Sequence, residues 1–157
     1  MIVVSDTSVI NYLVQINLAD LPHRLYGEIC IPEQVLAELD HDGALPAVKN
    51  FIAAKPTWLT IKTMDSIATG LEDLDIGKAA AISLVLSLHC PLLVDGTAAR
   101  ARTKQLGLTA FGVLDILLDA AAQNMINFAE SLQRLRRTNF YISDELAESL
   151  TQQANRK

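Results

Sequence analysis

The amino-acid sequence predicts an α/β fold: a central, mostly parallel sheet of about five strands, flanked by helices, with extra helices at the C-terminus. Two observations favour it. Short apolar, β-branched runs recur along the chain and alternate with helical patterns, which is typical of a parallel sheet covered on both faces. Half of the 157 residues are hydrophobic and a fifth are charged, enough apolar material for a buried core. We therefore expect residues 1–157 to form a single domain.

Five short runs are the expected strands. Each is rich in β-branched or other apolar residues, and helical or turn-forming segments separate them. In chain order the runs are Ile2–Val4, Glu28–Ile31, Trp58–Lys62, Leu92–Val94 and Leu108–Phe111.

Helical patterns fill the first two gaps between these strands. Val9–Leu18 has an apolar face, and Leu21–Tyr26 is a short second helix. Pro32–Leu39 and Leu45–Ala54 each carry a proline in the first turn, where its missing N–H costs nothing.

The clearest helix is Asp75–Leu88, which starts with a good N-cap residue and continues through a run of alanines. Thr97–Leu106 follows and stops before Gly107. No strand pattern follows the last three helices, so we expect them to pack as an appendage. They are Val113–Gln123, Asn127–Arg137 and Ser143–Gln153.

Composition restricts the possible partners and location. The net charge is −5, so binding of nucleic acid would depend on a local basic patch or on metal ions that neutralise acidic groups. Cys30 and Cys90 lie beside apolar runs without a C-x-x-C or zinc spacing, which is typical of reduced thiols in a cytosolic protein. No apolar stretch is long enough to span a membrane, so we expect a cytoplasmic protein.

Four carboxylates are candidate functional groups. Asp6 and Asp95 each follow a predicted strand, at the sheet edge where open α/β proteins bind ligands. Glu38 lies near the end of the helix Pro32–Leu39, and Asp75 opens the alanine-rich helix. One interpretation makes the aspartates helix N-caps and Glu38 a solvated residue. The other brings carboxylates together around a cation, and oxygen ligands without histidine or cysteine suit Mg²⁺ or Mn²⁺.

Several short motifs, in order and at suitable spacing, resemble those of a PIN domain of the bacterial and archaeal subgroup. The resemblance covers nearly the whole chain. The matching stretches are Ile2-Val3-Val4-Ser5-Asp6-Thr7-Ser8, Ile31-Pro32-Glu33-Gln34-Val35-Leu36-Ala37-Glu38-Leu39, Leu74-Asp75-Ile76-Gly77, Asp95 to Leu108 with Arg100, and the tail Asn139 to Leu146.

This resemblance implies a Mg²⁺- or Mn²⁺-dependent endoribonuclease, often the toxin half of a toxin–antitoxin pair. It implies that Asp6 and Asp95 are metal ligands, and that Glu38 is a ligand or supports one. Thr7 or Ser8 would bind a phosphate or a metal-bound water. The metal would activate water for attack on a phosphodiester. The implied partners are RNA, a small antitoxin protein and a second copy of the chain in a homodimer.

The sequence departs from this subgroup at its third acidic motif. The subgroup reads Gly-Glu-Ala-Glu-Ala where this chain has a lysine and alanines after Gly77, and its second aspartate after the fourth strand is Gly96 here. Lys78 has two interpretations. It is an exposed residue on a solvated helix face, or its ammonium occupies the cation position among Asp6, Glu38 and Asp95.

Two classes of function follow. The first is an active metal-dependent ribonuclease, in which Asp75 supplies the missing carboxylate next to Lys78 on one helix face. The second is a non-catalytic PIN-fold module that binds RNA or a partner protein. For this second class, Arg100 and Lys104, at positions i and i+4 of one helix, are candidates for holding a phosphate, and the alternative is that they lie on a solvated helix surface.

Overall fold

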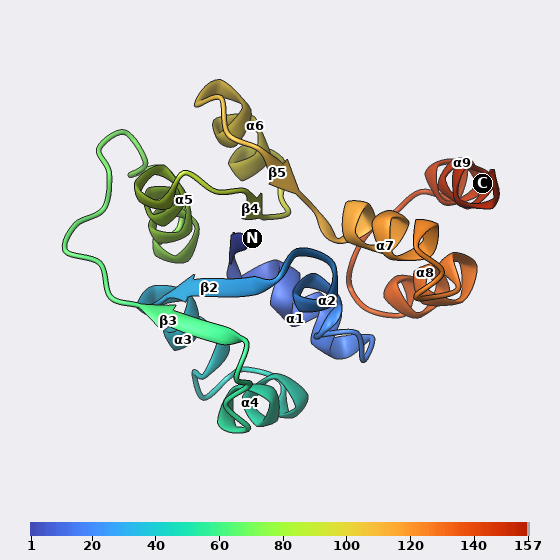
Figure 1. The fold of residues 1–157 in the computed structure, drawn as a ribbon, viewed down its shortest axis with the longest axis horizontal. Helices are drawn as coiled ribbons and strands as arrows, with labels where there is room; N and C mark the ends of the chain where they lie inside the picture. The colour runs from blue at the N-terminus through green and yellow to red at the C-terminus, as the bar shows by residue number, and fades with distance from the viewer. Residues whose placement is uncertain (157) are drawn as a thin grey trace.

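The computed structural model describes residues 1–156 and has the predicted α/β architecture (Figure 1). Over these residues one five-stranded sheet has the strand order β3-β2-β1-β4-β5, and every neighbouring pair is parallel. The strands are β1 (Ile2–Ser5), β2 (Glu28–Pro32), β3 (Leu59–Lys62), β4 (Leu92–Leu93) and β5 (Ala110–Phe111).

A helix lies at every position where the sequence predicts one. The helices are α1 (Thr7–Gln15), α2 (Leu21–Tyr26), α3 (Glu33–Leu39), α4 (Pro46–Ala53), α5 (Ile76–Leu88), α6 (Thr97–Gln105), α7 (Val113–Ala122), α8 (Phe128–Arg136) and α9 (Asp144–Asn155).

Three predicted elements have a boundary that is wrong by more than one residue: the first helix at both ends, the last strand at its start, and the last helix at its end, where it continues to Asn155 rather than Gln153. The first helix begins at Thr7 rather than Val9 because Asp6 is its N-cap, and it ends early because Asn17 adopts a left-handed φ of 62°. The last strand begins at Ala110 rather than Leu108. Gly107 has a φ of 70°, and the Leu108 N–H donates to the carbonyl of Thr103, so this residue still belongs to the end of α6.

Alternate residues of the strands enter two different cores. Val3 and Ile29 are paired in register and pack with α1, α2, α7 and α8 on one face. Val4 and Cys30 are paired next to them and pack with α5 on the other face. This alternation follows from the two-residue period of a strand and fixes the strand register, because a one-residue slip would exchange the two faces.

Small residues allow α5 to pack closely on the centre of the sheet. Ala79, Ala81, Ile82 and Val85 are all buried, as the alanine-rich pattern predicts, and α5 contacts both β1 and β2. The N-terminus of α5 is therefore held at the edge of the sheet where β1 ends. No helix among the described residues is long and apolar enough to cross a membrane.

The last three helices form a group beside the sheet, as expected (Figure 1). Helices α7, α8 and α9 contact one another, and α7 also contacts β5, α1 and α2. The short segment between α8 and α9 brings Phe140 and Tyr141 back to a hollow beside the end of β4. Cys30 is a buried free thiol and Cys90 a half-buried one.

Candidate functional site

Asp6 lies immediately after β1 and is completely buried. Its Oδ1 accepts the backbone N–H of Val9 at 3.1 Å, and the hydroxyl of Ser8 donates to Oδ2 at 2.9 Å. Its own N–H donates to the carbonyl of Leu93 at 2.9 Å, which extends the pairing of β1 with β4. The N-cap interpretation of Asp6 is therefore confirmed, but two hydrogen bonds do not neutralise a buried carboxylate.

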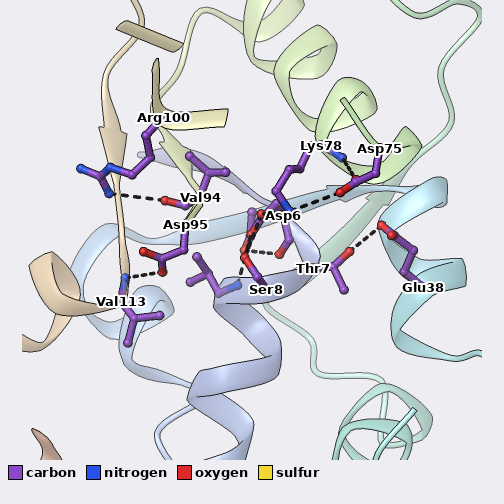
Figure 2. A network of polar contacts seen from close by, with 12 residues as sticks. Asp6, Thr7, Ser8, Glu38, Asp75, Lys78, Val94, Asp95, Arg100 and Val113 are labelled. Carbon is purple, nitrogen blue, oxygen red and sulfur yellow. Dashed lines mark hydrogen bonds and ion pairs between the residues drawn. The ribbon is translucent and has the colours of Figure 1, made fainter. Parts of the chain in front are cut away.

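The neutralising charge comes from Lys78 in the first turn of α5 (Figure 2). Its Nζ lies 3.5 Å from Oδ2 of Asp6 and 3.4 Å from Oδ2 of Asp75. Asp75 is the N-cap of α5, as predicted, and accepts the backbone N–H of Lys78 at 2.9 Å. The lysine is thus not a free surface residue: its ammonium bridges a buried carboxylate and an exposed one.

Glu38 of α3 reaches the same edge next to the start of α5 (Figure 2). The hydroxyl of Thr7 donates to Oε1 of Glu38 at 2.7 Å, so Glu38 is not a merely solvated helix residue. Gly77 makes this approach possible, because a Cβ at that position would lie 1.6 Å from Oε1 of Glu38. The side chains of Glu38 and Lys78 therefore both lie near the end of β1, on the side where α3 and α5 meet (Figure 2).

Asp95 follows β4, but the interpretation of Asp95 as the N-cap of its own helix is wrong. Gly96, with a φ of 99°, occupies that place, and Asp95 turns toward α7, where its Oδ2 accepts the N–H of Val113 at 2.9 Å. A Cβ on Gly112 would lie 2.5 Å from Oδ1 of Asp95, so a glycine is needed for this close contact.

Arg100 lies beside Asp95 and is held by a residue that the sequence analysis missed. Its Nη1 is 3.4 Å from the carbonyl of Val94 and 3.5 Å from Oδ2 of Asp115. Asp115 also accepts the N–H of Gly112 at 2.8 Å. An acidic residue three positions after a glycine at a predicted helix start is the signal that could have identified it. Lys104, by contrast, is exposed on α6 and lies outside the hollow that Arg100 shares with Lys78.

Burial determines the electrostatics of this site. It raises the pKa of Asp6 to about 6, although Lys78 and the hydrogen bonds from Val9 and Ser8 oppose the shift. Burial also raises the pKa of Asp95, against the N–H of Val113 and the charge of Arg100. For Lys78, burial disfavours the charge, but Asp6 and Asp75 outweigh it and raise the ammonium pKa. At neutral pH the ion pair between Lys78 and Asp6 is therefore charged.

As they stand, these side chains do not fit a divalent metal ion. Among the described residues, no group of three or more histidine, cysteine, aspartate or glutamate side chains is arranged to hold one. The implied ligands Asp6, Glu38 and Asp95 instead contact Lys78, Thr7 and the N–H of Val113. The cation beside Asp6 is an ammonium, at the position where the subgroup has a glutamate.

The fold and the site define an α/β protein with an acidic centre at the carboxyl edge of a parallel sheet. Comparison with known families identifies it further: a family model described as a PIN domain, DUF3368, matches residues 2–156, so the chain belongs to the PIN-domain family. PIN domains are generally nucleases that bind nucleic acids and use divalent metals.

A solved structure supports the fold. A PilT N-terminus domain protein from the hyperthermophilic archaeon Sulfolobus solfataricus is similar, with a TM-score of 0.58 and 14% sequence identity, over 91% of this chain and 100% of that one. At this identity the similarity concerns the fold alone. The comparison with curated proteins gave no match.

Proposed function

We propose that this protein is a PIN-domain module that binds single-stranded RNA, in which the ammonium of Lys78 takes the place of a divalent cation. One observation carries the proposal: Nζ of Lys78 lies 3.5 Å from the buried carboxylate of Asp6 and 3.4 Å from that of Asp75. PIN domains generally use divalent metal ions, and here an ammonium of the chain itself lies between the two carboxylates.

The exposure of the charged groups supports an anionic ligand. The Asp6 side chain is inaccessible, whereas the side chains of Lys78 and Arg100 are 23% and 41% exposed and line one hollow. Asp95 also lines it, but its carboxylate accepts a backbone N–H. A phosphate in the hollow would therefore meet two cations, each fixed by aspartates behind it. RNA phosphates are such ligands.

The test is RNA binding and RNA cleavage by matched variants. In EDTA the wild type should bind a fluorescein-labelled single-stranded RNA, with an affinity that falls as salt rises. Lys78→Gln should weaken binding, while Lys55→Gln, which removes an exposed charge far along the chain from the site, should not. Equal affinities for the three proteins would contradict the proposal.

A second candidate is a Mg²⁺- or Mn²⁺-dependent endoribonuclease of toxin–antitoxin type, with the small antitoxin protein and the homodimer that the resemblance implies. The observation that favours it is the retention of carboxylates on three elements, Asp6 after β1, Glu38 on α3 and Asp95 after β4. Cleavage of the same RNA by the wild type in Mn²⁺, lost in Asp6→Asn, would favour this candidate over the first.

A further inference from the structure

The hollow beside Lys78 has an aromatic wall as well as charged groups. Tyr12 of α1 and Phe140 and Tyr141 from the segment between α8 and α9 line it together with Lys78 and Arg100. These residues come from widely separated parts of the chain, and the segment between α8 and α9 supplies two of the three aromatic side chains. The proposed RNA-binding role of Lys78 does not by itself account for the aromatic residues.

Tyr141 is the most exposed large apolar side chain of the described residues, at 87%. Both of its neighbours are anchored. Phe140 meets Tyr12 in an edge-to-face contact with ring centroids 5.0 Å apart, and its N–H donates to the hydroxyl of Thr138. Ile142 is buried, and its carbonyl accepts from Arg136 at 3.4 Å. The ring of Tyr141 is thus presented to solvent by a fixed backbone.

An exposed ring beside two cations favours one class of ligand. Single-stranded nucleic acid binds through cations that contact its phosphates and aromatic rings on which its unpaired bases stack. A small anion would use the cations and leave the ring without a role. A double-stranded helix keeps its bases stacked on one another and could not use the ring either.

We propose that Tyr141 is a base-stacking residue, which receives one unpaired base of a single-stranded RNA whose neighbouring phosphate lies at Lys78 and Arg100. This inference rests on the proposed function and adds a subsite to it. The phenol ring supplies the stacking surface, so its hydroxyl is dispensable. Phe140 and Tyr12 pack against each other and form the other aromatic part of the wall of the hollow.

The experiment measures binding of a short fluorescein-labelled single-stranded RNA by anisotropy, in EDTA so that nothing is cleaved. Tyr141→Ala should weaken binding about five- to tenfold, which is the lower part of the range for loss of one base–aromatic stack. Tyr141→Phe and Tyr141→Trp should bind as tightly as the wild type. Leu146→Ala, which truncates another exposed side chain of the same C-terminal region, is the matched control. Melting curves check that each variant is folded.

A second series locates the base. RNAs with one abasic position at each successive site should include one that binds the wild type about fivefold more weakly, and Tyr141→Ala should not distinguish this RNA from the intact one.

If the wild type binds RNA and Tyr141→Ala binds equally well, the stacking inference is overturned and the proposed function stands. Equal losses in Tyr141→Ala and Tyr141→Phe would mean a hydroxyl contact and would also overturn stacking. If the wild type binds no RNA, both proposals fail.

Discussion

Asp6 has two structural tasks that conflict. As the N-cap of α1 it must accept the N–H of Val9, which places its carboxylate in a completely buried position. An ionised carboxylate there is costly unless a cation lies close by, and Lys78 supplies that cation. The pKa of about 6 shows that the compensation is incomplete. Asp6 therefore lowers the stability of the protein while it is ionised.

This conflict predicts that Asp6→Asn stabilises the protein at alkaline but not at acid pH. The folded-state pKa is raised from 3.8 to about 6, so the folded state binds the proton more tightly than the unfolded state does. The ionisation of Asp6 accordingly lowers the free energy of unfolding as the pH rises between these two pKa values. At higher pH the loss reaches about 3 kcal/mol. Asparagine resembles the protonated acid and is an equally good N-cap.

Urea unfolding in EDTA checks this prediction. At pH 8 Asp6→Asn should gain about 2 kcal/mol over the wild type, and below pH 4 the two proteins should have similar free energies of unfolding. Asp75→Asn, which changes an exposed N-cap of α5, should stay within about 0.5 kcal/mol of the wild type. A gain for Asp6→Asn that is the same at both pH values would contradict the electrostatic explanation.

At this scale the sequence could predict the acidic residues but not all of their partners. A lysine in place of the expected glutamate was visible, and its spacing from Asp75 predicted their contact. The ion pair of Asp115 with Arg100 and the exposure of Tyr141 were not predicted. Asp115 resembles an ordinary acidic residue in a first helical turn, and Tyr141 lies in an irregular segment, where no periodicity tells which side chain is exposed.

At the scale of elements, the start of α5 is the most tightly constrained part of the site. Gly77 lies against Glu38 of α3, and Lys78 follows it and contacts the end of β1. The glycine is buried at a helical position, where alanine would ordinarily be favoured by up to about 1 kcal/mol. Its small size is needed for the approach of α3, not for backbone freedom.

We therefore expect Gly77→Ala to have opposite effects in two backgrounds. In the wild type the new Cβ would displace the Glu38 carboxylate and break its hydrogen bond from Thr7, at a net cost of about 1 kcal/mol. In Glu38→Ala the obstacle is absent, so the same change should stabilise by about 0.5 kcal/mol. A double-mutant cycle from urea unfolding measures this coupling. The same sign in both backgrounds would mean that the contact does not limit the helix.

The order of the elements was accessible from the sequence, because alternating apolar periods of two and 3.6 residues reflect burial in a covered parallel sheet. The ends of the elements were less accessible. Whether Leu108 begins a strand depends on its hydrogen bond to Thr103 across Gly107, and whether α1 begins at Thr7 depends on the capping choice of Asp6. Each of these two boundaries is set by a single hydrogen bond, which cannot be predicted from the spacing of apolar residues.

At the scale of the whole molecule, the fold brings four elements to one point. The ends of β1 and β4 are adjacent because the strands are parallel neighbours, and α3 and α5 flank them. A change of charge there is therefore coupled to the stability of the whole domain. In the metal-free protein Lys78 joins α5 to the end of β1 electrostatically, and a glutamate at this position would repel the carboxylate of Asp6.

Lys78→Glu should convert the site from one stabilised by an ammonium into one stabilised by a metal. Replacing a positive by a negative charge roughly 6 Å from a divalent ion changes their interaction by several kcal/mol at an effective dielectric of about 20, and solvent reduces this strongly. We expect metal affinity to rise at least about tenfold, or about 1.4 kcal/mol. In EDTA the variant should melt at a lower temperature than the wild type, since Asp6 loses its cation, and Mn²⁺ should restore the loss in proportion to binding.

The control is Lys78→Gln, which removes the ammonium without adding a carboxylate and so separates loss of the ion pair from gain of a ligand. This variant should be destabilised in EDTA but recover less in Mn²⁺. If the melting temperatures of Lys78→Glu and the wild type respond identically to Mn²⁺, the ammonium does not stand in a cation site and Lys78 only caps the charge of Asp6.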